Sequence, residues 1–236
     1  MNIGEIIGDS LTYPLNNIKA LLIYMVLGII LGLVMVFTGV GAVVAGKSNP
    51  AALIGIGAIG VIICVIIHFL IQGYMLDIIN YGINKRYNAP DIEFGRNISN
   101  GIKLTIVQIV YFIIPLILTV LFGAIFRSWL ASIIGIILFI IFAFAEFMGE
   151  CRLANSDSLA YALSIGDAIS DIFKVGILKI IITIIVVVII GGIIYGILSY
   201  LFNFIPYLGG ILTGILGVYL LFFINRSIGL LYSDAA

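Results

Sequence analysis

The feature of this sequence that most limits its fold is a set of long apolar runs with almost no charged residues. A helix that crosses a hydrocarbon layer about 30 Å thick needs about 20 apolar residues, because each residue adds about 1.5 Å of length. The chain holds enough such runs for six crossings. We predict spans over residues 20–46, 51–76, 104–126, 130–148, 175–200 and 208–224.

The composition excludes a soluble protein. Only 9% of the 236 residues are charged, 63% are hydrophobic, and the mean hydropathy is +1.33. A soluble domain carries about 25% charged residues, so this chain lacks the charges to cover a surface that faces water. Disorder is excluded too, because disordered chains combine low hydrophobicity with high charge. We therefore expect an all-α membrane protein, a bundle of six transmembrane helices.

The distribution of basic residues predicts the orientation. Six crossings put both termini on one side, and nine of the eleven Lys and Arg residues fall there, against Lys47 and Arg127 on the other. Lys and Arg accumulate in cytoplasmic loops, so we expect both termini in the cytoplasm and the protein in the cell membrane. The nine residues are Lys19, Lys85, Arg86, Arg96, Lys103, Arg152, Lys174, Lys179 and Arg226.

A short motif recurs three times along the chain. The hexapeptides IGDSLT (7–12), FGRNIS (94–99) and IGDAIS (165–170) each precede a pair of spans. They indicate one membrane domain, 1–236, with pseudo-repeats of about 1–82, 83–150 and 151–236, each an amphipathic cytoplasmic segment followed by a helical hairpin. These segments either lie in the plane of the membrane surface or pack as connectors on the bundle.

Polar groups cluster at the cytoplasmic ends of the second helices of the hairpins. His68 and Gln72 lie one turn apart in the second span, Glu146 and Glu150 one turn apart in the fourth, and Arg226 ends the sixth. One interpretation is an inward-facing polar site for a cation or a polar headgroup. The alternative is that these side chains reach water at the interface, or form the pairs Glu146–Arg226 and Glu150–Arg152.

Other chemistry is not indicated. The sequence has one histidine, no nucleotide-binding motif and no defined metal motif, so we expect no enzyme activity, no cofactor and no metal. Cys64 and Cys151 have no paired spacing and are expected to be free thiols. The net charge of zero offers no basic face for nucleic acid. The expected partners are bilayer lipids, a second copy of the chain or another membrane protein.

Several segments together resemble a known family. IGDSLTYP before the first span, GYMLDIINYG at the end of the first hairpin, GIKLTIVQIVYFIIP in the third span and FFINRSIGLLY near the C-terminus are similar to a largely archaeal multi-pass membrane family, domain of unknown function 4013. The resemblance implies an integral membrane protein and supplies no site residues. The connector around Lys85 to Pro90 is more polar and poorer in proline than the family pattern.

The residues favour a non-enzymatic membrane scaffold, binding or lipid-interacting module, because the spans hold few deep polar groups. The alternative is a permease or channel for a small solute or ion. For this second function, Pro115 and the glycine-rich helices would line the pathway, and the polar groups at the cytoplasmic ends would form the site.

Overall fold

The computed structural model of the chain describes residues 1–46, 50–126, 129–205 and 208–236. Within these ranges it contains helices and no strand, as the sequence predicts. The predicted turn residues Lys47 to Asn49, Arg127, Ser128, Pro206 and Tyr207 lie outside the described residues. The helices are α1 (Ile3–Asn16), α2 (Ile18–Gly46), α3 (Pro50–Ile83), α4 (Phe94–Phe126), α5 (Trp129–Ser156), α6 (Leu159–Ala162), α7 (Ile165–Val175), α8 (Ile177–Phe202) and α9 (Gly209–Tyr232).

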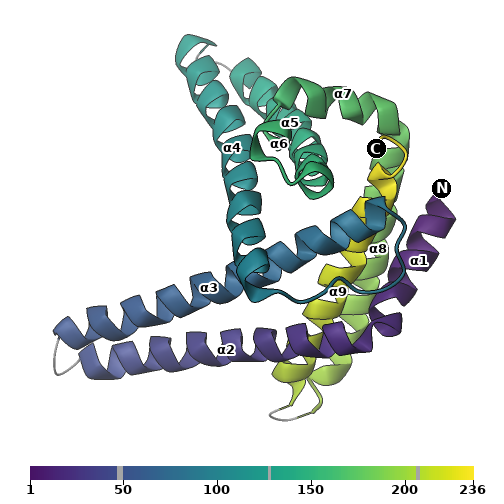
Figure 1. Cartoon of the computed structure of the whole chain (residues 1–236). Coiled ribbons are helices and arrows are strands. Elements are labelled where there is room, and N and C mark those ends of the chain that lie inside the picture. The colour runs from purple at the N-terminus through teal and green to yellow at the C-terminus, as the bar shows by residue number, and fades with distance from the viewer. Residues whose placement is uncertain (47–49, 127–128, 206–207) are drawn as a thin grey trace.

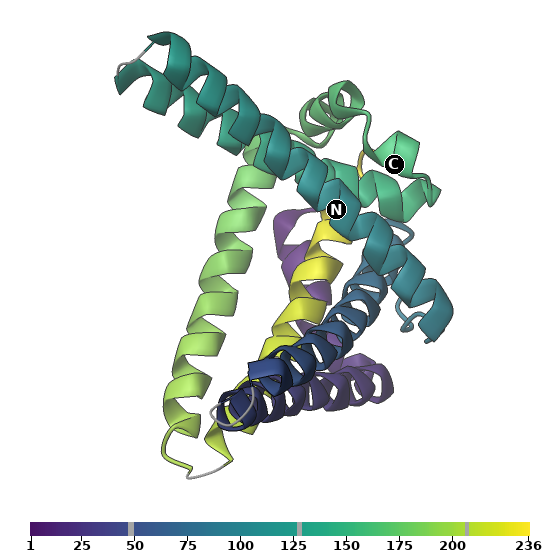
Figure 2. The same cartoon turned by 90° about the vertical axis from the view of Figure 1, so that its left-hand side faces the viewer.

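Six of these helices, α2, α3, α4, α5, α8 and α9, are long and apolar enough to cross a membrane, which confirms the predicted architecture. They pair as three hairpins, which we call arms: α2–α3, α4–α5 and α8–α9 (Figure 1). The arms meet at one end and diverge from it (Figure 1), and in the view turned by 90° the second arm points away from the other two (Figure 2). We call the meeting region, residues 1–24, 70–107, 145–180 and 216–236, the hub.

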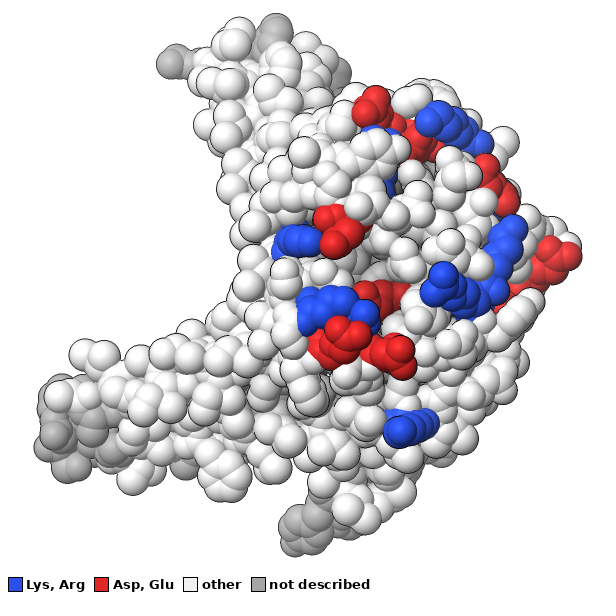
Figure 3. All heavy atoms as spheres, viewed as in Figure 1, with Lys and Arg blue, Asp and Glu red and all other residues white. Residues whose placement is uncertain are grey.

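The arms and the hub have opposite surface chemistry. Large apolar side chains on the arms are open to the surroundings, with Phe37 71%, Ile54 72% and Ile125 72% exposed. On the face in Figure 3, the charged side chains gather over the hub, and the described parts of the arms outside the hub carry none. Exposing this much apolar surface to water is unfavourable by about 25 cal/mol per Å². The arms are therefore suited to hydrocarbon and the hub to water.

Three helices extend further into the hub than the predicted spans. α3 continues to Ile83, α5 to Ser156 and α9 to Tyr232, each about seven or eight residues beyond the apolar run. Packing in the hub, and not hydrophobicity alone, supports these extra turns. For example, Ile79 of α3 and Leu230 of α9 lie in these turns, and both side chains are completely buried in the core.

The amphipathic segments differ between the three units. α1 and α7 are separate helices that bury Ile6 and Ala168 completely in the core, which matches the connector interpretation. Residues 94–103, in contrast, form the first turns of α4 and run into the span without a break. Gly176, with φ +96°, separates α7 from α8, so the fifth span begins at Ile177 and not at 175.

Single glycines allow the long helices to cross closely. At the crossing of α3 and α9, a Cβ built on Gly82 would lie 2.9 Å from the Cα of Gly229. At the crossing of α3 and α4, a Cβ on Gly73 would meet the backbone of Asn97, and one on Gly101 would meet the backbone of Phe69. The backbones touch at these points, so α3 is held against α4 and α9 at the centre of the hub.

Candidate functional site

The first prominent site in the hub is an ion pair between the two ends of the chain. Arg226 of α9 is completely buried and donates from Nε to Oδ1 of Asp9 in α1 at 2.7 Å, and from Nη2 to Oδ2 at 3.2 Å. Its Nη1 donates to the carbonyl of Arg86, and its guanidinium lies 4.5 Å from the ring centroid of Tyr13. This fork geometry satisfies the buried charge and fixes α1 on α9.

A second buried arginine repeats this arrangement between α5 and α7. Arg152 is 2% exposed and donates to Asp171 at 2.7 Å and to Asp167 at 3.1 Å. Its Nε donates to the carbonyl of Tyr161, and the ring centroid of the same tyrosine lies 3.6 Å from its guanidinium carbon. The charge of α5 is thereby neutralised by α7, the helix that precedes the third arm.

The third pair has the reverse order of charges. Asp77 of α3 accepts from Nη2 of Arg96 in α4 at 3.1 Å, and Glu93 accepts from Nη1 of the same arginine at 3.3 Å. The Arg96 side chain is 40% exposed, so this pair lies nearer the surface than the other two. Asn100 completes the contact by donating to Asp77 at 3.2 Å.

The three contacts, which we call the hub ion pairs, follow one rule. The third residue of each repeated hexapeptide, Asp9, Arg96 or Asp167, pairs with a charged residue near the hub end of the hairpin that comes before it in the cycle. The first arm is thus joined to the second unit, the second arm to the third unit, and the third arm back to the first unit. The hub ion pairs therefore link the three units in a closed cycle.

Sequence reasoning missed this cycle, although a signal for it is present. The hexapeptides align, but nothing in the alignment itself connects the charge at their third position with the opposite charges of Asp77, Arg152 and Arg226. The reversal at Asp77 and Arg96 would have been the most informative clue, because both members of the pair change sign together. Such a matched change is expected when two positions are in contact.

Asp171 is the carboxylate of the hub that accepts hydrogen bonds from the largest number of side chains. It accepts from Arg152, from Lys174 at 2.6 Å and from the hydroxyl of Tyr232 at 2.9 Å. Burial alone would raise the pKa of Asp171, but the hydrogen bonds from Lys174, Arg152 and Tyr232 outweigh it and lower the pKa below its ordinary value. The carboxylate is therefore held in its charged form.

A further group of charged contacts lies near the start of α8. Lys179 donates to Asp234 and to the carbonyl of Met1, and the same Asp234 accepts from the N-terminal amine at 3.1 Å. Burial would raise the pKa of Asp234, but its hydrogen bonds to Lys179 and the amine lower it. Both ends of the described chain are thus fixed beside α8.

The structure distributes the predicted site residues over different contacts. Glu150 accepts from Gln108 at 2.8 Å, and Arg226 pairs with Asp9. The alternative pairs Glu146–Arg226 and Glu150–Arg152 are not formed, because each arginine is closer to an aspartate of α1 or α7. A shared membrane level favoured Glu146–Arg226 and local sequence distance favoured Glu150–Arg152, whereas tertiary packing selects the aspartates.

His68 lies in a different environment. It is exposed on α3 and lines a cavity of about 730 Å³, together with Cys64 and Thr105 of α4. Gln72 and Glu146 are partly exposed, in α3 and α5 respectively. Among the described residues there is no group of three His, Cys, Asp or Glu side chains that could hold a metal ion.

Both cysteines are free, as the sequence predicts. Cys64 is partly exposed in α3, and Cys151 is buried in α5 beside the carbonyl of Ile228 in α9. The charged side chains of the hub are mostly engaged with one another. Such contacts hold helices in place, and they are the principal chemistry that this arrangement of charges supports.

Comparisons with known proteins give one match. The sequence model of a family described as "Protein of unknown function (DUF4013)" matches residues 56–203, more than half of the chain. No curated protein and no solved structure matches. The matched region extends from α3 to α8 and so contains two of the three hub ion pairs.

Proposed function

The chain belongs to the DUF4013 family, a family of unknown function, and we propose from its geometry that this multi-pass membrane protein is a non-enzymatic scaffold. The observation that carries the proposal is the closed cycle of hub ion pairs. A cycle of contacts between successive units fixes the three arms relative to one another at the hub. A protein built in this way holds membrane-spanning hairpins apart at set positions.

The exposed surfaces of the arms support the same function. They carry exposed apolar side chains, such as Ile62 of α3 (59%) and Val120 of α4 (64%). In a bilayer these surfaces contact acyl chains or the helices of a neighbouring membrane protein or second copy. We propose that the scaffold presents them to such partners, and that nucleic acid is not among them.

We also propose that the hub lies in the cytoplasm and the arms in the cell membrane. All the described Lys and Arg residues belong to the hub, whereas the two on the opposite side in the predicted topology, Lys47 and Arg127, lie outside the described residues. Basic residues accumulate on the cytoplasmic side of membrane proteins. At the other ends of the arms, exposed Trp129 and Tyr200 suit the opposite interface.

A second candidate function is a permease or channel for a small solute or ion. The observation that favours it is the cavity of about 730 Å³ lined by His68, Cys64 and Thr105. Thr105 belongs to α4, and one turn further along this helix Gln108 donates a hydrogen bond to Glu150 of α5. A permease must alternate between two arrangements of its helices. A scaffold keeps one, and this difference separates the two functions experimentally.

Distances between arms measured by electron paramagnetic resonance test the scaffold. Spin labels are placed at Phe37→Cys in α2 and Tyr200→Cys in α8, two exposed positions, after both native cysteines are replaced by alanine. In lipid nanodiscs we expect a single distance peak that does not move with pH or added salts. Two populations, or a peak that shifts with an ion, would support the permease and contradict the scaffold.

A matched pair of variants connects this distance to the hub. We expect Arg226→Met to broaden the peak, because it removes the contact that joins the third arm to α1. Lys85→Met removes the same charge from an exposed position in the hub, so it should leave the peak unchanged. Equal peaks in both variants would show that the hub ion pairs do not set the arms.

A further inference from the structure

The cavity beside the first arm is lined by three side chains that can bind a soft metal ion. It has a volume of about 730 Å³, and its lining includes Met35 of α2 and Cys64 and His68 of α3. Thiolate and thioether sulfur atoms select copper(I) among the metal ions, and imidazole is also a ligand of copper. When the thioether of methionine is counted with Cys and His, the first arm therefore offers three metal-binding side chains at one cavity.

Two of these side chains lie on one face of α3. Cys64 and His68 are four residues apart, so their Cβ atoms are about 5–6 Å apart on the same side of the helix. Pairs of ligands with this spacing bind metal ions in known helical metal sites. Within the described structure, the ring of His68 packs beside Phe69 and takes part in no hydrogen bond, so its nitrogen atoms are available to a ligand.

The third side chain comes from the facing helix at the same level of the arm. Where α2 and α3 touch, a Cβ built on Gly60 would overlap Cγ2 of Thr38. Because the two helices are antiparallel, Met35 lies one turn from Thr38 toward the hub, and Cys64 lies one turn from Gly60 toward the hub. The levels of Met35 and Cys64 therefore differ by only about 1.5 Å, the rise of one residue. Methionine has three rotatable bonds, so its thioether can turn toward the thiol.

Charge balance in hydrocarbon favours a monovalent ion at this place. Metal binding requires the thiolate, so the thiol of Cys64 releases its proton to water as the ion binds, and no electron is transferred. Copper(I) and one thiolate together have no net charge, whereas zinc(II) would leave one positive charge in the bilayer, which is costly. The described lining of the cavity contains no Asp or Glu, so Mg²⁺ and Ca²⁺ lack the carboxylate ligands that they prefer.

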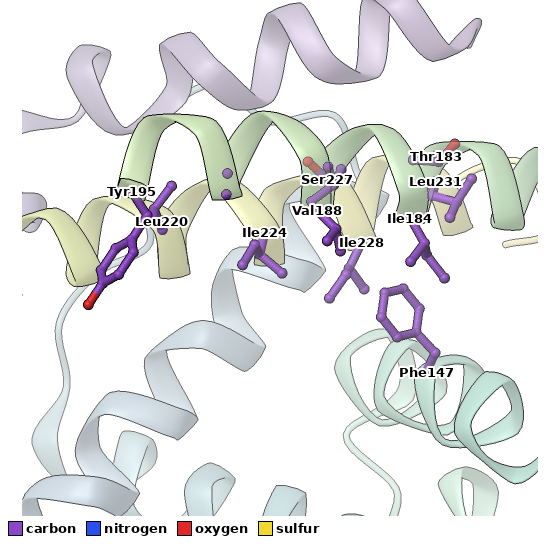
Figure 4. Close-up of a pocket in the computed structure, with 13 residues that line it drawn as sticks. Phe147, Thr183, Ile184, Val188, Tyr195, Leu220, Ile224, Ser227, Ile228 and Leu231 are labelled. Carbon is purple, nitrogen blue, oxygen red and sulfur yellow. The ribbon is translucent and has the colours of Figure 1, made fainter. Parts of the chain in front are cut away.

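The other two arms lack such side chains. The groove between α8 and α9, with a volume of about 380 Å³, is lined by side chains that carry carbon and oxygen atoms but neither nitrogen nor sulfur (Figure 4). His68 and Cys64 lie nine and thirteen residues before Asp77, the hub charge of α3. The positions at the same distances before Arg152 and Arg226 are Ala143 and Phe139 in α5, and Gly217 and Thr213 in α9. The repeated fold therefore does not itself require a thiol and an imidazole here.

We propose that Met35, Cys64 and His68 form a binding site for one copper(I) ion, coordinated by two sulfur atoms and one imidazole nitrogen. This site goes beyond the proposed scaffold and does not depend on it, because all three ligands belong to the first arm. The sequence alone does not indicate the site. A metal motif is a spacing within one segment, whereas Met35 is brought to Cys64 and His68 by the packing of α2 against α3.

Copper titration of the full-length protein in lipid nanodiscs tests the proposal. Copper(I) is added in the absence of oxygen together with bicinchoninate, a coloured chelator that competes for the ion. We expect one copper(I) ion to bind per chain, and no zinc(II) to be retained after gel filtration at the same concentration. A protein that leaves all the copper with the chelator, or that retains zinc and not copper, would overturn the proposal.

The two cysteines provide a matched comparison. Cys64→Ala removes the thiol of the site, whereas Cys151→Ala makes the same change at the buried cysteine of α5, which does not line the cavity. Loss of a group that only supports a metal ligand costs about 10–100-fold in affinity. We therefore expect Cys64→Ala to bind copper(I) at least about 100-fold more weakly and Cys151→Ala to bind it as the wild type does. Equal affinities of the two variants would overturn the proposal.

X-ray absorption at the copper edge identifies the other ligands. We expect two sulfur neighbours and one nitrogen neighbour in the wild type. Met35→Leu should remove one sulfur neighbour, and it should not disturb folding because Met35 is 56% exposed. Met25→Leu, in the same helix but outside the lining, should keep both.

Two results of this measurement would overturn the site. One is a shell of nitrogen and oxygen only, which would mean adventitious copper, and the other is the same number of sulfur neighbours in Met35→Leu and Met25→Leu. The distance measurement that tests the scaffold uses a protein without Cys64, so it is made in the absence of the copper site. Failure of the copper site is therefore distinguishable from failure of the scaffold.

Discussion

Gly229→Leu is expected to lower the apparent melting temperature of the detergent-solubilised protein by about 6–12 °C. A Cβ at this position would lie 3.0 Å from the carbonyl carbon of Ile79 and closer still to its oxygen, and 2.9 Å from the Cα of Gly82. These are backbone atoms of α3 that cannot rotate away. Overpacking costs about 3 kcal/mol in such a site, and each kcal/mol shifts the melting temperature of a chain this long by about 2–4 °C.

Gly32→Leu is the control for this substitution. A Cβ on Gly32 in α2 would meet no atom within 4 Å, and the residue is exposed on an arm. Leucine is also a better helix former than glycine by almost 1 kcal/mol, so this variant should be as stable as the wild type or more stable. A Gly229→Leu protein as stable as Gly32→Leu would mean that α3 and α9 do not touch at this crossing.

The second large effect is expected for Arg152→Met. This substitution leaves Asp171 buried with one of its strongest partners removed, although Lys174 and Tyr232 remain on it. Breaking a buried ion pair in this way costs about 3–5 kcal/mol, and the remaining partners favour the lower figure. Arg96→Met is the matched control, because it breaks an equivalent hub ion pair that is more exposed and should cost about 0–1 kcal/mol.

The pH dependence gives the same test a second measurement. Because the pKa of Asp171 is lowered in the folded protein, its stabilisation is complete above the ordinary carboxyl pKa of 3.8 and is lost as the pH falls through the lowered pKa. Without Arg152 that pKa rises toward its ordinary value, so the part of the acid loss of stability that comes from Asp171 should be smaller in thermal melting of Arg152→Met than of Arg96→Met. Equal stability and equal pH profiles for Arg152→Met and Arg96→Met would contradict the account.

The sequence predicts the arms well and the hub poorly, for a physical reason. An arm is defined by its solvent, and runs such as residues 20–46 lack the charges that water would require. The hub, in contrast, depends on contacts between side chains that are far apart in the sequence. Asp9 and Arg226 are 217 residues apart, and nothing local to either of them identifies the other. The alternative pair Glu150–Arg152, which local sequence distance favours, is therefore not formed, and Arg152 pairs with Asp167 and Asp171.

The glycines illustrate the same limit. Spacings of four residues within one helix, such as Gly28 with Gly32 or Gly192 with Gly196, suggest helix-packing faces. At Gly32, Gly192 and Gly196, however, a Cβ would meet no atom. The closest crossings use single glycines on two different helices, such as Gly82 and Gly229, and their pairing is visible only when the helices are placed in space.

Cysteine labelling in intact cells tests most directly whether the arms cross the membrane between the hub and the far turns. Single cysteines replace Asn88, exposed in the hub, or Asn203, exposed at the end of the third arm, in a protein whose native cysteines are alanine. With a maleimide that does not cross membranes, we expect Asn203→Cys to react in intact cells and Asn88→Cys to react only after permeabilisation. Reaction of both from the same side would contradict the account.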